Sequence, residues 1–321
     1  MAGTEGSRIP CFDGREEIVK TALAAATLLA LAGCSGSRFT PTISRAAFAQ
    51  YGIAGNVTLL YVSDVGTNAV YTYSYPGGSP KATLRGFATP LGACADPAGD
   101  VFVVNTEKND ILRYAHDGKK PLAILKDAGQ LPQDCAHDRV TGDLAVTNYS
   151  PSGSNLGSVA IFERSKGVPR TIKDPNVLQY LYCAYDGKGD LFVDGLDFSF
   201  NFVLIELPRG GTKFARLALS QRFTGWGGLA WDGKDLAIGD GATTIYRFAI
   251  SAQKATRVGT TQLKRATNVV RFAIQGSTLI GADGPNGGKR DVGFWKYPAG
   301  GSPVKTLSGR FKNPSGVALS L

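Results

Sequence analysis

Short apolar runs alternate with turn-forming residues along most of the chain. In the stretch from Pro90 to Asn105, a small apolar segment precedes the turn Asp96–Gly99, and the β-branched and aromatic run Val101–Val104 follows it. This pattern predicts a strand, a tight turn and a second strand. A hairpin of this size cannot bury its own faces, so it needs neighbours that stack against it.

The chain contains these neighbours as an internal repeat. The first strand of the hairpin recurs in the segments Gly92–Asp96, Asp134–Asp138, Tyr182–Asp186, Gly228–Asp232, Arg271–Gln275 and Gly316–Ser320. The last residues of these segments are 42, 48, 46, 43 and 45 positions apart. Five of the units continue into a second strand: Val101–Asn105, Leu144–Asn148, Leu191–Gly195, Leu236–Asp240 and Leu279–Asp283. A third strand follows each of these.

A period near 45 residues with four strands in each unit is typical of a β-propeller. The sixth unit lacks its later strands, because the chain ends at Leu321, whereas the segment from Thr58 to Leu84 supplies them near the start. We therefore predict an all-β, six-bladed β-propeller over residues 56–321. Pairing of Pro314–Ser320 with Thr58–Ser63 would close the ring and remove the sheet edges.

Residues 1–34 have the pattern of an export signal. An uncharged run of Ala and Leu, Thr21–Ala32, follows Lys20 and is too short for a stable transmembrane helix. Leu31–Cys34 is similar to the lipobox of bacterial lipoproteins, which implies acylation of Cys34 and anchoring to a membrane. The alternatives are a plain signal peptide and a short apolar helix. We expect residues 35–55 to be a tether, and the protein to reside in the periplasm or on the outer cell surface.

The charge is positive but dispersed. The formal net charge is +9, and without residues 1–34 it becomes 32 − 22 = +10. The longest basic runs are pairs such as Lys119–Lys120, whereas a nucleic-acid site usually concentrates its basic residues on one face. No nucleic-acid partner is expected; the charge suits either an anionic envelope surface or a solvated surface without a partner.

Three cysteines lie in the predicted propeller: Cys94, Cys135 and Cys183. Because three is an odd number, at least one thiol has no partner within the chain. All three occupy small apolar strands, so we expect buried hydrophobic side chains and neither a disulfide framework nor a metal site.

The repeat, with Gly-x-Ala-x-Asp, a Gly/Asp turn and a Leu-Tyr-Val-x-Asp strand, resembles the NHL-type repeat. That repeat is shared with the six-bladed propellers of the gluconolactonase and senescence-marker-protein group. The resemblance implies a divalent metal such as Ca²⁺ at the channel mouth, with Asn105, Asn148 and Asp194 in positions that match Asn and Asp ligands. The chain departs from the group because no Glu lies near Leu59–Ser63, where a Glu ligand is expected.

Polar residues end most of the second strands, and two interpretations of them stand. The residues Asp64, Asn105, Asn148, Asp240 and Asp283 either form a ring of oxygen ligands for a cation or close their own turns by accepting backbone N–H groups. The two histidines offer little chemistry. His116 lies in a turn, and His137 occupies a packing position of its strand.

Three first strands break the repeat at their opening residue. Gly opens the strand at Gly92, Gly228 and Gly316, whereas Asp134, Tyr182 and Arg271 open the others. Since inner strands line the axial channel, we expect these three side chains to converge at a ligand-binding mouth, with room left by the glycines and an aromatic wall from Trp226. A water-filled entrance without a ligand is the alternative.

These patterns favour a non-catalytic module at the cell envelope that binds an envelope protein or a small anionic or carbohydrate-derived ligand. The alternative is a metal-dependent lactonase or related hydrolase of the gluconolactonase type. The scarcity of His and Glu favours the first, so we expect no enzyme activity. No catalytic residue can be assigned from the sequence.

Overall fold

A computed structural model describes residues 58–149, 156–284 and 287–321. All of them belong to the compact unit Asn56–Leu321. The expected signal sequence, the tether of residues 35–55 and the acylation site Cys34 lie outside the described residues. Within the described ranges, no helix is both long enough and apolar enough to cross a membrane.

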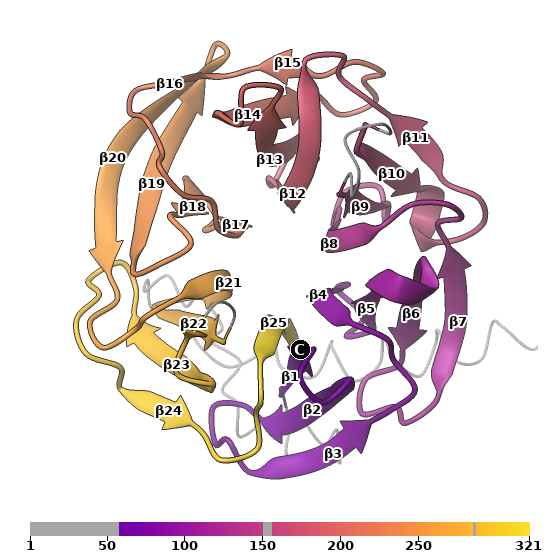
Figure 1. Cartoon of the computed structure of the whole chain (residues 1–321), viewed down its shortest axis with the longest axis vertical. Coiled ribbons are helices and arrows are strands. Elements are labelled where there is room, and N and C mark those ends of the chain that lie inside the picture. Colours follow the sequence, from indigo (N-terminus) through magenta and orange to yellow (C-terminus); the bar gives the residue numbers. More distant parts are fainter. Residues whose placement is uncertain (1–57, 150–155, 285–286) are drawn as a thin grey trace, which may run out of the picture. The chain divides into compact units, whose positions relative to one another are not determined.

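The described strands form six sheets arranged around a central axis, as the sequence repeat predicts (Figure 1). The sheet that joins the two ends of the repeat contains, from the axis outward, β25 (Pro314–Ser320), β1 (Leu59–Asp64), β2 (Ala69–Ser74) and β3 (Pro80–Leu84). Strand β25 pairs with β1 in antiparallel register, with Val317 opposite Val62. The predicted closure of the ring is therefore confirmed.

The next three sheets each run outward in chain order. Blade 2 contains β4 (Pro90–Ala95), β5 (Val101–Asn105), β6 (Asp110–Tyr114) and β7 (Pro121–Lys126). Blade 3 contains β8 (Pro132–His137), β9 (Leu144–Asn148), β10 (Ser158–Phe162) and β11 (Arg170–Ile172). Blade 4 contains β12 (Val177–Tyr185), β13 (Leu191–Asp197), β14 (Phe202–Leu207) and the short β15 (Ala215–Arg216).

Blade 5 departs from the expected four strands. From the axis outward it contains β17 (Leu229–Trp231), β18 (Leu236–Gly239), β19 (Thr244–Ser251), β20 (Lys254–Gln262) and β16 (Ala218–Leu219). Strand β16 pairs with β20 in parallel, because the chain leaves the edge of blade 4 and joins the edge of blade 5. Blade 6 contains β21 (Val269–Gln275), β22 (Thr278–Asp283), β23 (Asp291–Lys296) and β24 (Lys305–Leu307).

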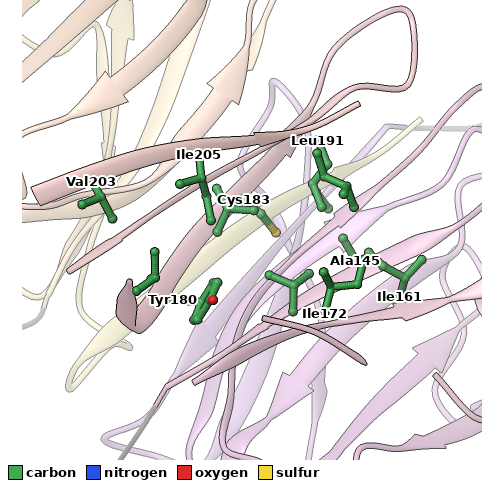
Figure 2. Packing of buried hydrophobic residues seen from close by; sticks show 13 residues of the cluster. Ala145, Ile161, Ile172, Tyr180, Cys183, Leu191, Val203 and Ile205 are labelled. Atoms are coloured by element: carbon green, nitrogen blue, oxygen red, sulfur yellow. The ribbon is translucent and has the colours of Figure 1, made fainter. Parts of the chain in front are cut away.

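The core lies between neighbouring blades, where facing side chains of two sheets pack together. Figure 2 shows the cluster between blades 3 and 4, in which Ala145 and Ile161 of one sheet face Cys183 and Val203 of the other. The second strands bury both faces in this arrangement, which explains why they are continuous apolar runs such as Val101–Val104.

A disulfide joins Cys94 of β4 to Cys135 of β8, with Cα atoms 5.8 Å apart. The expectation that the cysteines are only buried hydrophobic residues is therefore wrong for this pair. The two lie two and three residues before the last residue of their repeats, so strand alternation turns them toward opposite sides of their blades and hence toward each other. Cys183 sits at the same position as Cys135 and remains a buried free thiol, since it packs against Ala136 of the preceding blade.

Candidate functional site

The Arg271 side chain connects inner strands of four different blades. From β21 it donates one hydrogen bond to the carbonyl of Ser315 (3.0 Å) and another to the carbonyl of Gln133 (2.9 Å). Its Nε lies 3.4 Å from Oδ1 of Asp134, at ion-pair distance without hydrogen-bond geometry. Its guanidinium carbon lies 4.9 Å from the ring centre of Tyr182. The structure thus brings together three of the four residues predicted to bind a ligand.

These three residues are enclosed rather than open to a channel mouth. The side chain of Arg271 is only 7% exposed, and that of Asp134 is 11% exposed. Burial raises the pKa of Asp134 to about 6, and the neighbouring Arg271 guanidinium limits the rise. Burial also raises the pKa of Tyr182 to about 12. The contacts of Arg271 are internal, so this cluster serves first to join blades across the axis.

The glycines beside this cluster do not leave room for a ligand, contrary to our expectation. A Cβ atom placed on Gly92 would lie 2.7 Å from the Cα of Asp134, and one on Gly228 would lie 3.3 Å from the Cα of Arg271. Glycine is needed there because neighbouring inner strands approach closely. The space that the missing side chains release is taken up by backbone.

Trp226 does not take part in these axial contacts. It lies in the loop before β17 and is 46% exposed. Its role as the aromatic wall of a ligand site stays a prediction, as does ligand binding by Asp134, Tyr182 and Arg271.

The three residues matched to metal ligands have different surroundings. Asn105 accepts a hydrogen bond from the backbone of Ala88 and donates one to Asp110. Asn148 donates to Asp127 and to the Ser158 hydroxyl. The two amides therefore support the loops of their own blades.

Asp194 is the exception, because it lies beside the axial cluster. Its Oδ1 accepts the backbone N–H of Tyr182 (2.8 Å), whereas its buried Oδ2 has no hydrogen-bond partner among the described residues. Burial raises the pKa of Asp194 well above its ordinary value, and the charge of Asp134 adds to the rise. A role of Asp194 as a metal ligand stays a prediction.

The other strand-end carboxylates close turns, as one of the two interpretations expects. Asp64 accepts the backbone N–H groups of Thr67, Lys312 and Asn313. Asp240 and Asp283 accept backbone N–H groups in the same way. Among the residues that the structure describes, no group of three or more His, Cys, Asp or Glu side chains could hold a metal ion.

Neither histidine lies in a catalytic arrangement. His137 stacks on Phe102, with ring centres 5.9 Å apart, and burial lowers its pKa. His116 is half-buried, and its Nδ1 forms a hydrogen bond of 2.6 Å with the Ser320 hydroxyl on the closing strand. Both contacts hold blades together.

A cleft of about 540 Å³ lies at the rim, where the chain passes from blade 4 to blade 5. It is lined by Asp197, Asn201, Phe202, Val203, Leu204, Arg216, Leu217, Ala218, Leu219, Gln221, Arg222 and Phe223. Its volume falls in the range typical of ligand sites. The cleft is not among the sequence predictions, although the shortened apolar pattern after Leu207 is a signal for it.

Comparison with known proteins gives the fold and no family. No protein-family model matches the chain. A crystal structure of a protein of unknown function from Bacteroides caccae superposes with a TM-score of 0.60 at 14% identity, over 82% of this chain and 99% of that one. Adenosylhomocysteinase from Thermosynechococcus vestitus is 27% identical over 167 residues. That alignment spans 44% of this chain and 38% of the enzyme, too little to place the chain in its family.

Proposed function

We propose that the chain is an exported, lipid-anchored β-propeller that binds a partner through its rim and carries out no chemistry at its axis. The proposal rests mainly on the internal contacts of the Arg271 side chain. It is the axial group best suited to hold an anionic ligand, yet two backbone carbonyls, a carboxylate and an aromatic ring already engage it.

Exposed side chains that a partner could contact lie at the rim. Phe198 and Phe200, in the loop between β13 and β14, are 55% and 66% exposed. Arginine and aromatic side chains line the cleft next to this loop. Clusters of exposed apolar residues near an open cleft are typical of interaction sites.

The disulfide supports the exported location. Bonds such as Cys94–Cys135 persist in oxidising compartments and are rare in the cytosol. It therefore agrees with the export pattern of residues 1–34, which includes the lipobox cysteine Cys34.

Fatty-acid labelling and fractionation test the proposal. We expect the parent protein to carry label and to sediment with membranes, and the Cys34→Ala variant to lose both properties. An unlabelled, soluble parent protein would overturn the anchoring. A companion assay offers lactones to the purified protein with and without added Ca²⁺. Hydrolysis that disappears in an Asp194→Asn variant of unchanged melting temperature would overturn the non-catalytic role in favour of the lactonase alternative.

A further inference from the structure

The rim cleft arises because one segment changes partners between two sheets. Strand β15 pairs with β14, with Arg216 opposite Ile205, and the N–H of Leu217 still bonds to the carbonyl of Leu204. The next residue, Ala218, instead donates to Gln253 of blade 5. The chain thus separates from β14 at this point and leaves a fork between the two blades (Figure 1).

The strand register shows which backbone groups face the fork. The backbone N–H of Asp197 donates to the carbonyl of Asn201, so the backbone groups of Asn201 face β13. These directions alternate along an antiparallel strand, and the next pair is Leu196 with Phe202. The N–H and C=O of Phe202 therefore point away from β13. Continued pairing would place them opposite Leu219. That residue follows the diverging segment, so the described residues supply Phe202 with no outer strand partner.

The wall of the fork opposite Phe202 also has a backbone N–H and C=O that face the fork. The N–H of Ala218 bonds to the carbonyl of Gln253, just before β20, and the N–H of Ser220 bonds to the carbonyl of Ala255 in β20. Alternation along the strand therefore directs the N–H and C=O of Leu219 away from β20, toward the fork. Each wall thus presents a backbone donor and acceptor that an inserted strand could satisfy.

The side chains around the fork favour an acidic occupant. Arg216 and Arg222 line it, and both are exposed. Among the described residues that line the cleft, the one carboxylate is that of Asp197. It accepts the backbone N–H groups of Ser199 and Asn201 and lies 3.6 Å from Arg216. Desolvation acts to raise the pKa of Asp197, but these hydrogen bonds and the Arg216 guanidinium lower it by more. Asp197 is therefore ionised, and its charge is already engaged within the protein.

The floor of the fork is aromatic. The rings of Phe202 and Phe223 stack with centres 4.5 Å apart, and Phe223 also packs edge-on against Tyr246. Such a floor gives an incoming apolar side chain a rigid surface. Alternating acidic and apolar side chains would meet the arginines and the floor respectively.

We propose that this cleft binds an extended, acidic peptide segment of a partner protein, which adds as a strand between β14 and β16 and pairs with the backbone of Phe202 and Leu219. The inference rests on the proposed rim-binding function and names its partner class. Backbone pairing supplies the affinity, and Arg216 and Arg222 select acidic side chains.

Fluorescence anisotropy with labelled octapeptides tests the proposal on the full-length purified protein. The probes are an alternating Val/Glu peptide, its Val/Lys counterpart, and the Val/Glu peptide N-methylated at alternate peptide bonds. We expect the Val/Glu peptide to bind, and the other two to bind about tenfold or more weakly. The N-methylated probe keeps the charges and removes donors from one strand edge, so it separates strand pairing from attraction of charge alone.

Two exposed-residue variants complete the test. Arg222→Glu should weaken the Val/Glu peptide about tenfold or more, whereas Lys120→Glu makes the same charge change on blade 2 and should leave binding unchanged. Hydrogen exchange should slow at the amides of Phe202 and Leu219 when the Val/Glu peptide is bound. Equal binding of the Val/Glu peptide and its N-methylated form would overturn the proposal, as would unchanged binding by Arg222→Glu.

Failure of this proposal and failure of the proposed function give different results. If the folded protein is labelled at Cys34 but binds none of the three peptides at about 1 mM, the peptide site is wrong and anchoring stands. If Cys34 is unlabelled and the Val/Glu peptide still binds, the peptide site stands and the lipid anchor is wrong.

Discussion

Replacing Arg271 by Ala should destabilise the propeller strongly, and more so at pH 8 than at pH 5. The substitution removes donors from the carbonyls of Ser315 and Gln133 and leaves Asp134 buried without its partner. Breaking a buried ion pair by removing one member typically costs about 3–5 kcal/mol. Domains are stable by only about 5–15 kcal/mol, so this is a large part of the total.

The pH dependence follows from the carboxyl group. The pKa of Asp134 is raised to about 6, so at pH 5 the folded parent protein already holds a proton on Asp134 and the ion pair contributes little. The variant then loses mainly the two carbonyl hydrogen bonds, about 2 kcal/mol in all. At pH 8 the variant must bury an unpaired carboxylate or bind a proton from dilute solution, and both cost additional free energy.

Urea unfolding followed by tryptophan fluorescence at the two pH values measures this effect. Arg85→Ala is the matched control, since Arg85 is exposed and its loss should change stability by less than about 0.5 kcal/mol. Adding Asp134→Asn to Arg271→Ala should recover part of the loss at pH 8. A loss below about 1 kcal/mol at pH 8, or an equal loss at both pH values, would refute the assignment of Arg271 as an axial brace.

Three further predictions concern the ring. Deletion of residues 314–321 removes the whole of β25, including the buried Val317, and should lower the free energy of unfolding by about 5 kcal/mol or more. Deletion of the exposed Leu321 alone should be tolerated. A protein without residues 314–321 that melts within a few degrees of the parent would contradict ring closure. Exchange of Cys94 and Cys135 for Ser should cost about 4 kcal/mol for a bridge spanning 41 residues, and equal urea midpoints with and without reductant would show that the bridge does not form. Because the pKa of Asp134 rises from 3.8 to about 6 on folding, the folded state binds more protons than the unfolded state between these pH values. The free energy of unfolding should therefore fall as pH rises through this window. If this free energy falls as steeply with pH in an Asp134→Asn variant as in the parent, the assignment to Asp134 is wrong.

The fold could be predicted from the sequence because the same pattern of apolar strands and turns occurs six times. Strand bounds such as Val101–Asn105 and Leu144–Asn148 agree with β5 and β9 residue for residue. The closure of the ring followed from the missing strands of the last repeat. Apolar periodicity reports burial directly, so it fixes strands and their partners.

The candidate site was harder, because contacts across the axis depend on distances that a repeat does not encode. The sequence identified Asp134, Tyr182 and Arg271 as departures from the pattern but could not tell an internal ion pair from an open mouth. The disulfide depends on the one-residue offset between Cys94 and Cys135, which turns the two thiols toward each other only once their blades are known to be neighbours. The cleft depends on where Ala218 changes sheets, which no local propensity specifies.

We propose that this propeller meets its partner at the rim of blades 4 and 5 and not at the axis. Hydrogen exchange tests it most directly, comparing the purified protein alone with the same protein mixed with solubilised envelope from cells that make only the Cys34→Ala variant. We expect slower exchange in residues 197–204 and 215–223, with no change in residues 132–135 and 269–272. Slower exchange confined to those axial strands would contradict it.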